Sequence, residues 1–453
     1  MRIIVATGLN AGAAEYRNMG DVAMLQVAIE RLFKLWPEAR IDVLTESSSN
    51  LERYCPGTKP VPRAGCECWV GDGLLLGRYH LWLPEWASHG LSRLKRSVGL
   101  RWPGLLKRMI LLRLRLRDEG GRRGAFEVFL EAFQNADLLV VSGSGGFADS
   151  GAEWNRSILG MAEAAIRRRI PVVMFGQGMG PLNDPTILSR AREIFPQITL
   201  ISLRGNRGAL SLLDSLGVSR TRVLTTGDEA IEPAFAARVE EPGYGIGINL
   251  RVASYSGVKS DCIGEVASVL QAFARRQETV LLPLPIAVHE YARDHETIRE
   301  LLTGFDDKSD GGSSLDTPLL LIKQTGRCRM VVTGAYHAAV FALAQGIPVV
   351  GMCNSPYYLS KFQGLQDTFG LGCAIVQMSE AGWPGKFAEA IETTWNSAEA
   401  VRLPLLKSSA RMIGESQGAY CRVKAILASR QTRPASFQGT PADRTESEPC
   451  RAS

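Results

Sequence analysis

Residues 330–351 read MVVTGAYHAAVFALAQGIPVVG, and this stretch decides the fold class. The apolar run 330–333 predicts a strand, Gly334 a turn, and 338–345 a helix. A second apolar run, 348–351, predicts the next strand. A strand, a helix and a strand in close succession are typical of a parallel βαβ unit. The stretch therefore predicts an α/β fold.

Short apolar runs alternate with helical stretches through most of the remaining sequence. This alternation predicts parallel sheets covered by helices, arranged as two Rossmann-like domains facing a cleft. Ligands of such sheets lie beyond the carboxyl ends of the strands. The other predicted strands are 2–6, 41–44, 137–141, 171–175, 199–203, 244–250 and 279–284, with helices at 22–35 and 264–276.

The domain boundary is predicted within 232–243, which contains two prolines and shows no clear periodicity. We expect one Rossmann-like domain over 1–235 and a second over 243–430. The run 306–314 is polar and rich in glycine, and predicts a loop. From about residue 430 the sequence loses its apolar content, which predicts a disordered tail over 431–453.

The composition is that of a globular protein, with 45% hydrophobic and 22% charged residues among 453. No apolar run is long enough to span a membrane, and the chain opens on a strand without signal-peptide features. The 9 cysteines are scattered, and Cys66-x-Cys68 lacks zinc-site spacing, so we expect a reduced cytoplasmic protein without a metal. A net charge of +6 fits an anionic substrate or membrane surface and is too small to indicate nucleic acid.

The stretch 91–123 departs from this plan, because arginines and lysines alternate there with leucines and Trp102, and acidic residues are few. One interpretation is a solvated pair of basic helices on the first domain. The other is an amphipathic element that contacts anionic lipid at the cytoplasmic face of a membrane. We favour the first, because 112–117 alternates with a period of two and fits a helical face poorly.

The motif Asn18 to Asp21 lies between the first strand and the first helix. Asp21 is placed to cap that helix, which is a purely structural role. Alternatively, Gly20 lets the backbone approach a ligand at the helix N-terminus. Two glycine-rich strand ends follow, at 143–146 and 176–180. Neither has the spacing of a dinucleotide or Walker motif, so each is a tight turn or a close approach to a substrate.

Two arginines end predicted strands, Arg204 in the first half and Arg251 in the second. A planar guanidinium suits phosphate or carboxylate, so the pair would clamp a small dianion as the cleft closes. The structural alternative for each is an interdomain salt bridge, for example with Asp228. Arg207 is expected on the helix that follows, facing solvent.

His337 is the strongest candidate for acid–base chemistry. It begins the helix of the opening stretch, just past a strand, and would face the cleft as a proton donor. A helix-capping histidine without chemistry is the alternative. Lys361 follows the next strand, and Tyr357 and Tyr358 precede it as stacking or packing residues.

Taken in order, these motifs resemble those of the polysaccharide pyruvyl transferases. The resemblance extends from the first residues to about residue 370, and the ordered set is more specific than any single motif. The residues that carry it are Asn18 to Asp21, Ser142 to Gly146, Gly176 to Pro181, Arg204, Gly227 to Ala230, Asn249 to Arg251, His337 with Gly346 and Pro348, and Lys361.

The resemblance implies a GT-B-like fold, phosphoenolpyruvate as donor without a further cofactor, and a sugar of a glycan or lipid-linked precursor as acceptor. It implies that the first domain faces the acceptor, that Arg204 holds the donor and that His337 is the general acid. The other matching positions are Arg251, Lys361 and Gly334 for the donor phosphate, Asn18, Gly20, Gly145, Gly146 and Gly178 for substrate binding, and Asp21 or Asp228 for orienting or deprotonating hydroxyls.

The sequence departs from the family pattern at Ala335. The family has Arg-x-His where this chain has Ala335-Tyr336-His337, so one arginine expected to bind the donor phosphate is absent. Losing such a charge-assisted contact costs on the order of 2–3 kcal/mol unless another group replaces it. The candidates for replacing it are Arg251, Lys323 and Lys361.

Two other functions stay open on the sequence. A glycosyltransferase would bind the diphosphate of a nucleotide sugar at the N-terminus of the His337 helix. The sequence lacks a clear acidic residue on the next helix to hold a ribose. A non-catalytic glycan- or lipid-binding relative would use 91–123 as its contact; the absent arginine fits that function, whereas the retained histidine and glycine loops oppose it.

Overall fold

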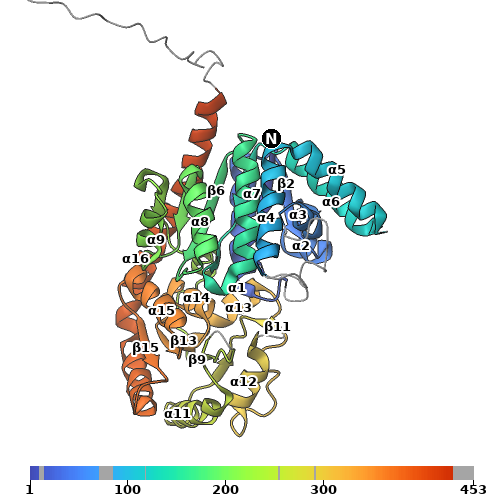
Figure 1. Ribbon diagram of the computed structural model, residues 1–453. Coiled ribbons are helices and arrows are strands. Elements are labelled where there is room, and N and C mark those ends of the chain that lie inside the picture. Colours follow the sequence, from blue (N-terminus) through green and yellow to red (C-terminus); the bar gives the residue numbers. More distant parts are fainter. Residues whose placement is uncertain (10–14, 71–84, 118, 254–255, 290–291, 432–453) are drawn as a thin grey trace, which may run out of the picture.

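The computed structural model describes residues 1–9, 15–70, 85–117, 119–253, 256–289 and 292–431. Within them, each half of the chain is built around a parallel sheet, and the two halves lie one above the other in Figure 1. Helices cover the sheets, so their strands are buried on both faces and carry nearly continuous apolar runs. The predicted α/β fold with two Rossmann-like domains is confirmed.

The first sheet has the strand order β3-β2-β1-β4-β6-β7-β8, with β5 paired to β6. The order reverses between β1 and β4, which is the topological switch point of a Rossmann fold. Its strands are β1 (Arg2–Ala6), β2 (Arg40–Thr45), β3 (Lys59–Pro62), β4 (Leu138–Val141), β5 (Ser144–Phe147), β6 (Val172–Met179), β7 (Leu200–Leu203) and β8 (Val223–Thr225).

The second sheet has the order β10-β9-β13-β14-β15, and its switch point lies between β9 and β13. A two-stranded antiparallel hairpin lies outside it. The strands are β9 (Gly245–Asn249), β10 (Leu281–Pro283), β13 (Cys328–Thr333), β14 (Val349–Cys353) and β15 (Cys373–Gln377), and the hairpin is β11 (Val288–His289) with β12 (Ala292–Arg293).

The helices follow the strands that they connect. Those before β9 are α1 (Met19–Leu35), α2 (Ser48–Tyr54), α3 (Arg63–Val70), α4 (Glu85–Arg101), α5 (Pro103–Leu116), α6 (Gly120–Gln134), α7 (Ala152–Arg167), α8 (Pro185–Ile194), α9 (Ala209–Ser215) and α10 (Ile231–Ala236). Those after it are α11 (Ile263–Arg276), α12 (Asp294–Leu302), α13 (Pro318–Thr325), α14 (Tyr336–Ala344), α15 (Pro356–Phe369) and α16 (Trp383–Gln431).

Helix α14, which the opening stretch predicted, lies at the junction of the two halves. All of its residues are buried, as expected for a helix that is apolar on every side. It packs in one core with Met19, Ala23 and Met24 of α1 and with residues of α10 and α13. The first turn of α14 is therefore held against the first turn of α1.

Helix α16 runs from the second half into the first (Figure 1). Phe387 and Ile391, near its start, pack in the core of the second sheet. Tyr420, near its end, packs in a core of the first sheet and stacks on Phe175 with ring centroids 3.7 Å apart. A segment of the predicted domain 243–430 thus packs in the first half. The predicted tail, 431–453, lies outside the described residues apart from Gln431.

The segment 232–243, where the domain boundary was predicted, contains the end of α10 at Ala236 and precedes β9. Helices α4 and α5 lie in the basic stretch 91–123. Its alternating part, 112–117, is helical up to Leu116, because α5 buries Leu106, Ile110 and Leu114 at a spacing of four residues. No helix among the described residues has the length and apolar composition needed to cross a bilayer.

Candidate functional site

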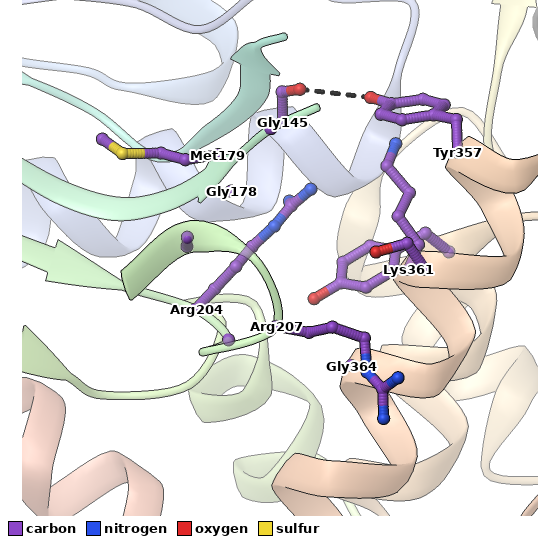
Figure 2. Close-up of a pocket in the computed structure, with 13 residues that line it drawn as sticks. Gly145, Gly178, Met179, Arg204, Arg207, Tyr357, Lys361 and Gly364 are labelled. Atoms are coloured by element: carbon purple, nitrogen blue, oxygen red, sulfur yellow. Dashed lines mark hydrogen bonds between the residues drawn. The ribbon is translucent and has the colours of Figure 1, made fainter. Parts of the chain in front are cut away.

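A pocket lies where the carboxyl ends of β5, β6 and β7 meet α14 and α15 (Figure 2). Arg204 enters it from the first half, and Lys361 enters it from the second. Figure 2 shows the two cationic side chains on opposite sides of the pocket. The Tyr357 hydroxyl closes one end by donating a hydrogen bond of 3.1 Å to the carbonyl of Gly145. The pocket is therefore built by both domains.

Arg204 follows β7 and is only 7% exposed. A Cβ added to Gly178 would lie 2.6 Å from its Nε, and one added to Gly145 would lie 2.5 Å from its Nη2. These two glycines are thus required by the guanidinium, which packs on the strand ends. On its other side, the guanidinium lies 4.3 Å from the ring centroid of Tyr336, a favourable cation–π contact.

Lys361 lies on α15 among three tyrosine rings. Its Nζ is 4.1 Å from the ring centroid of Tyr357, 5.0 Å from that of Tyr358 and 5.9 Å from that of Tyr336. No carboxylate of the described residues forms an ion pair with this ammonium. Burial lowers the pKa of Lys361, and the charge of Arg204 lowers it further, whereas Tyr357 opposes the shift. An anion in the pocket would relieve this cost.

His337 lies beside the pocket in the first turn of α14 and is 5% exposed. Its Nε2 is 3.6 Å from Oδ2 of Asp228, and no described residue accepts a hydrogen bond from it. The same Oδ2 accepts a hydrogen bond of 3.3 Å from Nη1 of Arg204. Asp228 thus lies between the imidazole and the guanidinium.

The surroundings of the Asp228 carboxylate favour its ionised form. Burial alone would raise its pKa, but the interactions with His337 and Arg204 outweigh burial and leave the pKa of Asp228 below its usual value. The backbone N–H of Ala230 adds a hydrogen bond of 2.9 Å to Oδ1. A negative charge therefore lies beside the imidazole of His337.

The motif 18–21 is arranged differently from the prediction. Asn18, not Asp21, caps α1: its Oδ1 accepts from the N–H groups of Gly20, at 3.1 Å, and Asp21. A Cβ on Gly20 would lie 1.9 Å from Cγ of His337, so the space expected for a ligand is filled by the imidazole.

Asp21 is free of the capping role and lies within electrostatic range of the site. Loss of hydration raises the pKa of Asp21, although His337, Arg204 and Lys361 all act to lower it. The residue as a whole is partly exposed. Asp21 and Asp228 therefore differ in proton affinity, with the pKa shifted upward in the first and downward in the second.

Three predicted positions lie elsewhere. Arg251 forms a buried pair with Asp294, with contacts of 2.7 Å and 2.8 Å, instead of an interdomain bridge with Asp228. Gly334 packs against the backbone of Arg251, where a Cβ would lie 2.7 Å from its nitrogen. Gly146 packs against Trp154, 3.2 Å from the position of a Cβ. All three support the walls of the site and do not line the pocket.

Sequence reasoning missed two features of the pocket. The sequence indicated no role for Tyr336, but its ring packs against the guanidinium of Arg204 and lines the pocket. Arg207 was expected on the following helix, but α9 begins at Ala209, and Arg207 instead pairs with Asp367 of α15 at 2.9 Å and 3.0 Å. In the sequence, only the position of Lys361 three residues after Tyr358 indicated the aromatic surroundings of the site.

Comparison with protein families decides what these motifs have in common. The model of the polysaccharide pyruvyl transferase family matches residues 18–356. This chain belongs to the polysaccharide pyruvyl transferase family. The match begins at Asn18 and includes Arg204, Asp228 and His337, whereas Lys361 lies just beyond it. No curated protein has a detectable sequence similarity to this family member.

Solved structures show the same fold at low sequence identity. The UDP-GlcNAc 2-epimerase from Methanocaldococcus jannaschii superposes with a TM-score of 0.53 at 13% identity, over 95% of this chain and 100% of that one. The UDP-GlcNAc 2-epimerase from Neisseria meningitidis, bound to UDP-GlcNAc, gives 0.52 at 12% identity, over 94% and 100%. Anabaena HepE in complex with UDP gives 0.50 at 12% identity, over 94% and 99%. The fold of this pyruvyl transferase family member is therefore GT-B-like.

Proposed function

We propose that this protein transfers the pyruvyl group of phosphoenolpyruvate to a sugar of a glycan or glycan precursor. One observation carries the proposal: Arg204 and Lys361, from different domains, face one pocket, and His337 lies beside it with Asp228 as its partner. Two cations around a small pocket suit a donor with a phosphate and a carboxylate. A histidine at that pocket suits a reaction that begins with protonation of carbon.

Lys361 replaces the arginine that is absent at Ala335 in this proposal. Of the three candidates, Arg251 is bound to Asp294, and Lys323 is exposed on α13, outside the pocket. Lys361 lines the pocket opposite Arg204. An ammonium is a point charge and cannot bind two oxygens in one plane as a guanidinium does. The three tyrosine rings compensate by holding the ammonium in place.

Protonated His337 would deliver its Nε2 proton to the methylene carbon of phosphoenolpyruvate, which becomes a methyl group. Positive charge then develops on the carbon that carries the phosphate and carboxylate. The carboxylate of Asp228, 3.6 Å from Nε2, would orient the imidazole. Asp228 also holds Arg204 in position, so one carboxylate sets both the acid and the anion-binding group.

A sugar hydroxyl would attack the cationic carbon and lose its proton, and a second hydroxyl would displace phosphate to close a ketal. The two hydroxyl protons are balanced by the proton returned to His337 and the one that leaves with inorganic phosphate. We assign to Asp21 the role of the base that takes the hydroxyl protons and passes them on to His337 and phosphate, because its pKa is raised and the residue is partly exposed. Arg204 and Lys361 would stabilise charge on the departing phosphate.

The acceptor would enter from the side of the first domain, where Gly145 and Gly178 line the pocket. Its sugar would be free or part of a lipid-linked precursor, and no further cofactor takes part. The rival reaction, transfer from a nucleotide sugar, would place a diphosphate at the N-terminus of α14. There, Gly20 and His337 are already in contact, which counts against that reaction.

The reaction is tested by incubating the purified protein with phosphoenolpyruvate and a panel of pyranosides. Release of inorganic phosphate and a new methyl singlet in the proton NMR spectrum are expected with one acceptor. His337→Gln should lower the rate about 10²–10⁴-fold, the usual contribution of a general acid. Turnover of a nucleotide sugar by the same protein, with none of phosphoenolpyruvate, would overturn the proposal.

A further inference from the structure

The outer surface of α5 is apolar and basic. Leu105, Leu112 and Leu116 follow one another at seven and four residues, so they form a single stripe along the helix. Their exposed fractions are 47%, 58% and 78%. The opposite face of α5 is the one that packs in the core, through Leu106, Ile110 and Leu114. The helix is therefore apolar on two sides and has a protein partner on only one of them.

The apolar stripe continues toward α4. Trp102, which precedes α5, is 55% exposed, and Leu94 of α4 is 58% exposed. Figure 1 shows α5 at the outer edge of the first domain, away from α11 and α12 of the second. Five of the exposed large apolar side chains of the described chain thus lie within 94–116. Large exposed apolar patches in globular proteins mark surfaces that bind something.

The charge around this stripe is positive. Between Leu91 and Arg117 the sequence contains nine arginines and lysines and no aspartate or glutamate. Arg108 and Arg115, seven residues apart, flank the leucines on one side of α5. Five of these cations form no ion pair with any described residue: Arg93, Arg101, Lys107, Arg108 and Arg115.

We propose that α4 and α5 form a docking surface for an anionic lipid bilayer. Leucines on one face, flanking arginines and a tryptophan at the edge are what an interfacial helix needs, because the leucines enter the acyl boundary while the arginines contact headgroups. Each basic residue near an anionic surface raises partition about fivefold. A nucleic acid would use the arginines but would leave the leucines in water. The proposal is independent of the reaction in the pocket.

The test is flotation of the full-length protein with vesicles of phosphatidylcholine, with and without phosphatidylglycerol. We expect binding to the anionic vesicles and little to the neutral ones. The double variant Arg108→Glu/Arg115→Glu should bind at least tenfold less, and high salt should weaken binding by the wild type. Leu105→Ser/Leu112→Ser should also bind less, and low salt should not restore it.

Matched controls lie on other helices. Arg156→Glu/Arg192→Glu changes two exposed arginines on α7 and α8, and Leu403→Ser changes an exposed leucine on α16, 76% exposed. Both controls should bind vesicles like the wild type. Quenching of Trp102 by brominated lipid, lost in Trp102→Phe, would support contact through this edge. Equal vesicle binding by all variants would overturn the proposal. So would a wild type that binds no vesicles but forms a dimer, if Leu105→Ser/Leu112→Ser abolishes that dimer.

Discussion

Gly20 and His337 are in direct contact across the junction of the two domains: a Cβ on Gly20 would lie 1.9 Å from Cγ and 2.0 Å from Nδ1 of the imidazole. The two residues lie in the first turns of helices that each follow a strand at a switch point, α1 after β1 and α14 after β13. The contact fixes the ring so that Nε2 points to Asp228. The position of His337, our proposed general acid in the second domain, is thus set by a glycine of the first.

Gly20→Ala should therefore abolish pyruvyl transfer, because the methyl group and the imidazole cannot occupy the same space. We expect kcat to fall at least 10²-fold, the lower end of a general-acid contribution. Gly264→Ala is the matched control, since a Cβ there meets no atom within 4 Å. The test is a comparison of kcat for the two variants by steady-state kinetics. A kcat near that of the wild type in Gly20→Ala would show that catalysis does not depend on this position of His337.

Donor binding should weaken at alkaline pH. Because the pKa of Lys361 is lowered, its amine loses its proton at a lower pH than an ordinary lysine, and a bound dianion favours the charged form. Affinity for phosphoenolpyruvate should thus fall as the pH rises toward the usual lysine range. In Lys361→Arg the charge persists, so the fall should move to higher pH.

Lys361→Met provides the reference for this titration, because it removes the charge at every pH. Its dissociation constant should exceed that of the wild type about 10–100-fold near neutral pH, the value of a hydrogen bond to a charged group. The ratio should shrink as the pH rises. A constant ratio between pH 7 and pH 10 would mean that Lys361 does not titrate in this range or does not touch the donor.

Glu229 lies behind the site, buried between the glycine strand ends and α16. Burial raises the pKa of Glu229 to about 7, although Arg31 and the hydroxyl of Tyr420 act against the shift. A carboxyl group with a raised pKa holds its proton in the folded protein when the unfolded chain has already lost it. The contribution of protonated Glu229 to the free energy of unfolding is therefore fully present below the unfolded pKa of about 4.5. This contribution is lost as the pH rises through about 7.

Glu229→Gln should raise the thermal-unfolding midpoint at pH 8 and change it much less at pH 5. The gain at pH 8 has an upper limit of about 3–4 kcal/mol, from the rise of the pKa from 4.5 to about 7 at about 1.4 kcal/mol per pKa unit. Glu232→Gln, which alters the other carboxylate partner of Arg31, is the control and should not show this pH dependence. An equal change in midpoint at both pH values would contradict the raised pKa.

The fold was predictable because a strand that is buried on both faces consists of a continuous run of apolar residues. The runs at 2–6, 171–175 and 330–333 correspond to β1, β6 and β13 within a few residues. The basic stretch was harder, since a period of two at 112–117 coincides with a helix whose two opposite faces are both apolar. Periodicity assumes one buried face, and α5 has a second apolar face that meets solvent.

The sequence indicated which residues lie near the cleft, but not which residues they contact. Arg204 and His337 end or follow strands, so topology alone places them near the cleft. Arg251 shares that position, but Asp294 binds it, and no local pattern reports a partner 43 residues away. The same limit explains why Gly20 was expected beside a ligand, because the imidazole of His337 that fills this space comes from the other half of the chain.

Calorimetric titration of phosphoenolpyruvate into the wild type and Arg204→Ala tests the central claim most directly. The account predicts saturable binding by the wild type, a loss of about tenfold or more in Arg204→Ala, and no competition by UDP-GlcNAc. Binding of UDP-GlcNAc alone, or phosphoenolpyruvate binding that is unchanged in Arg204→Ala, would contradict it.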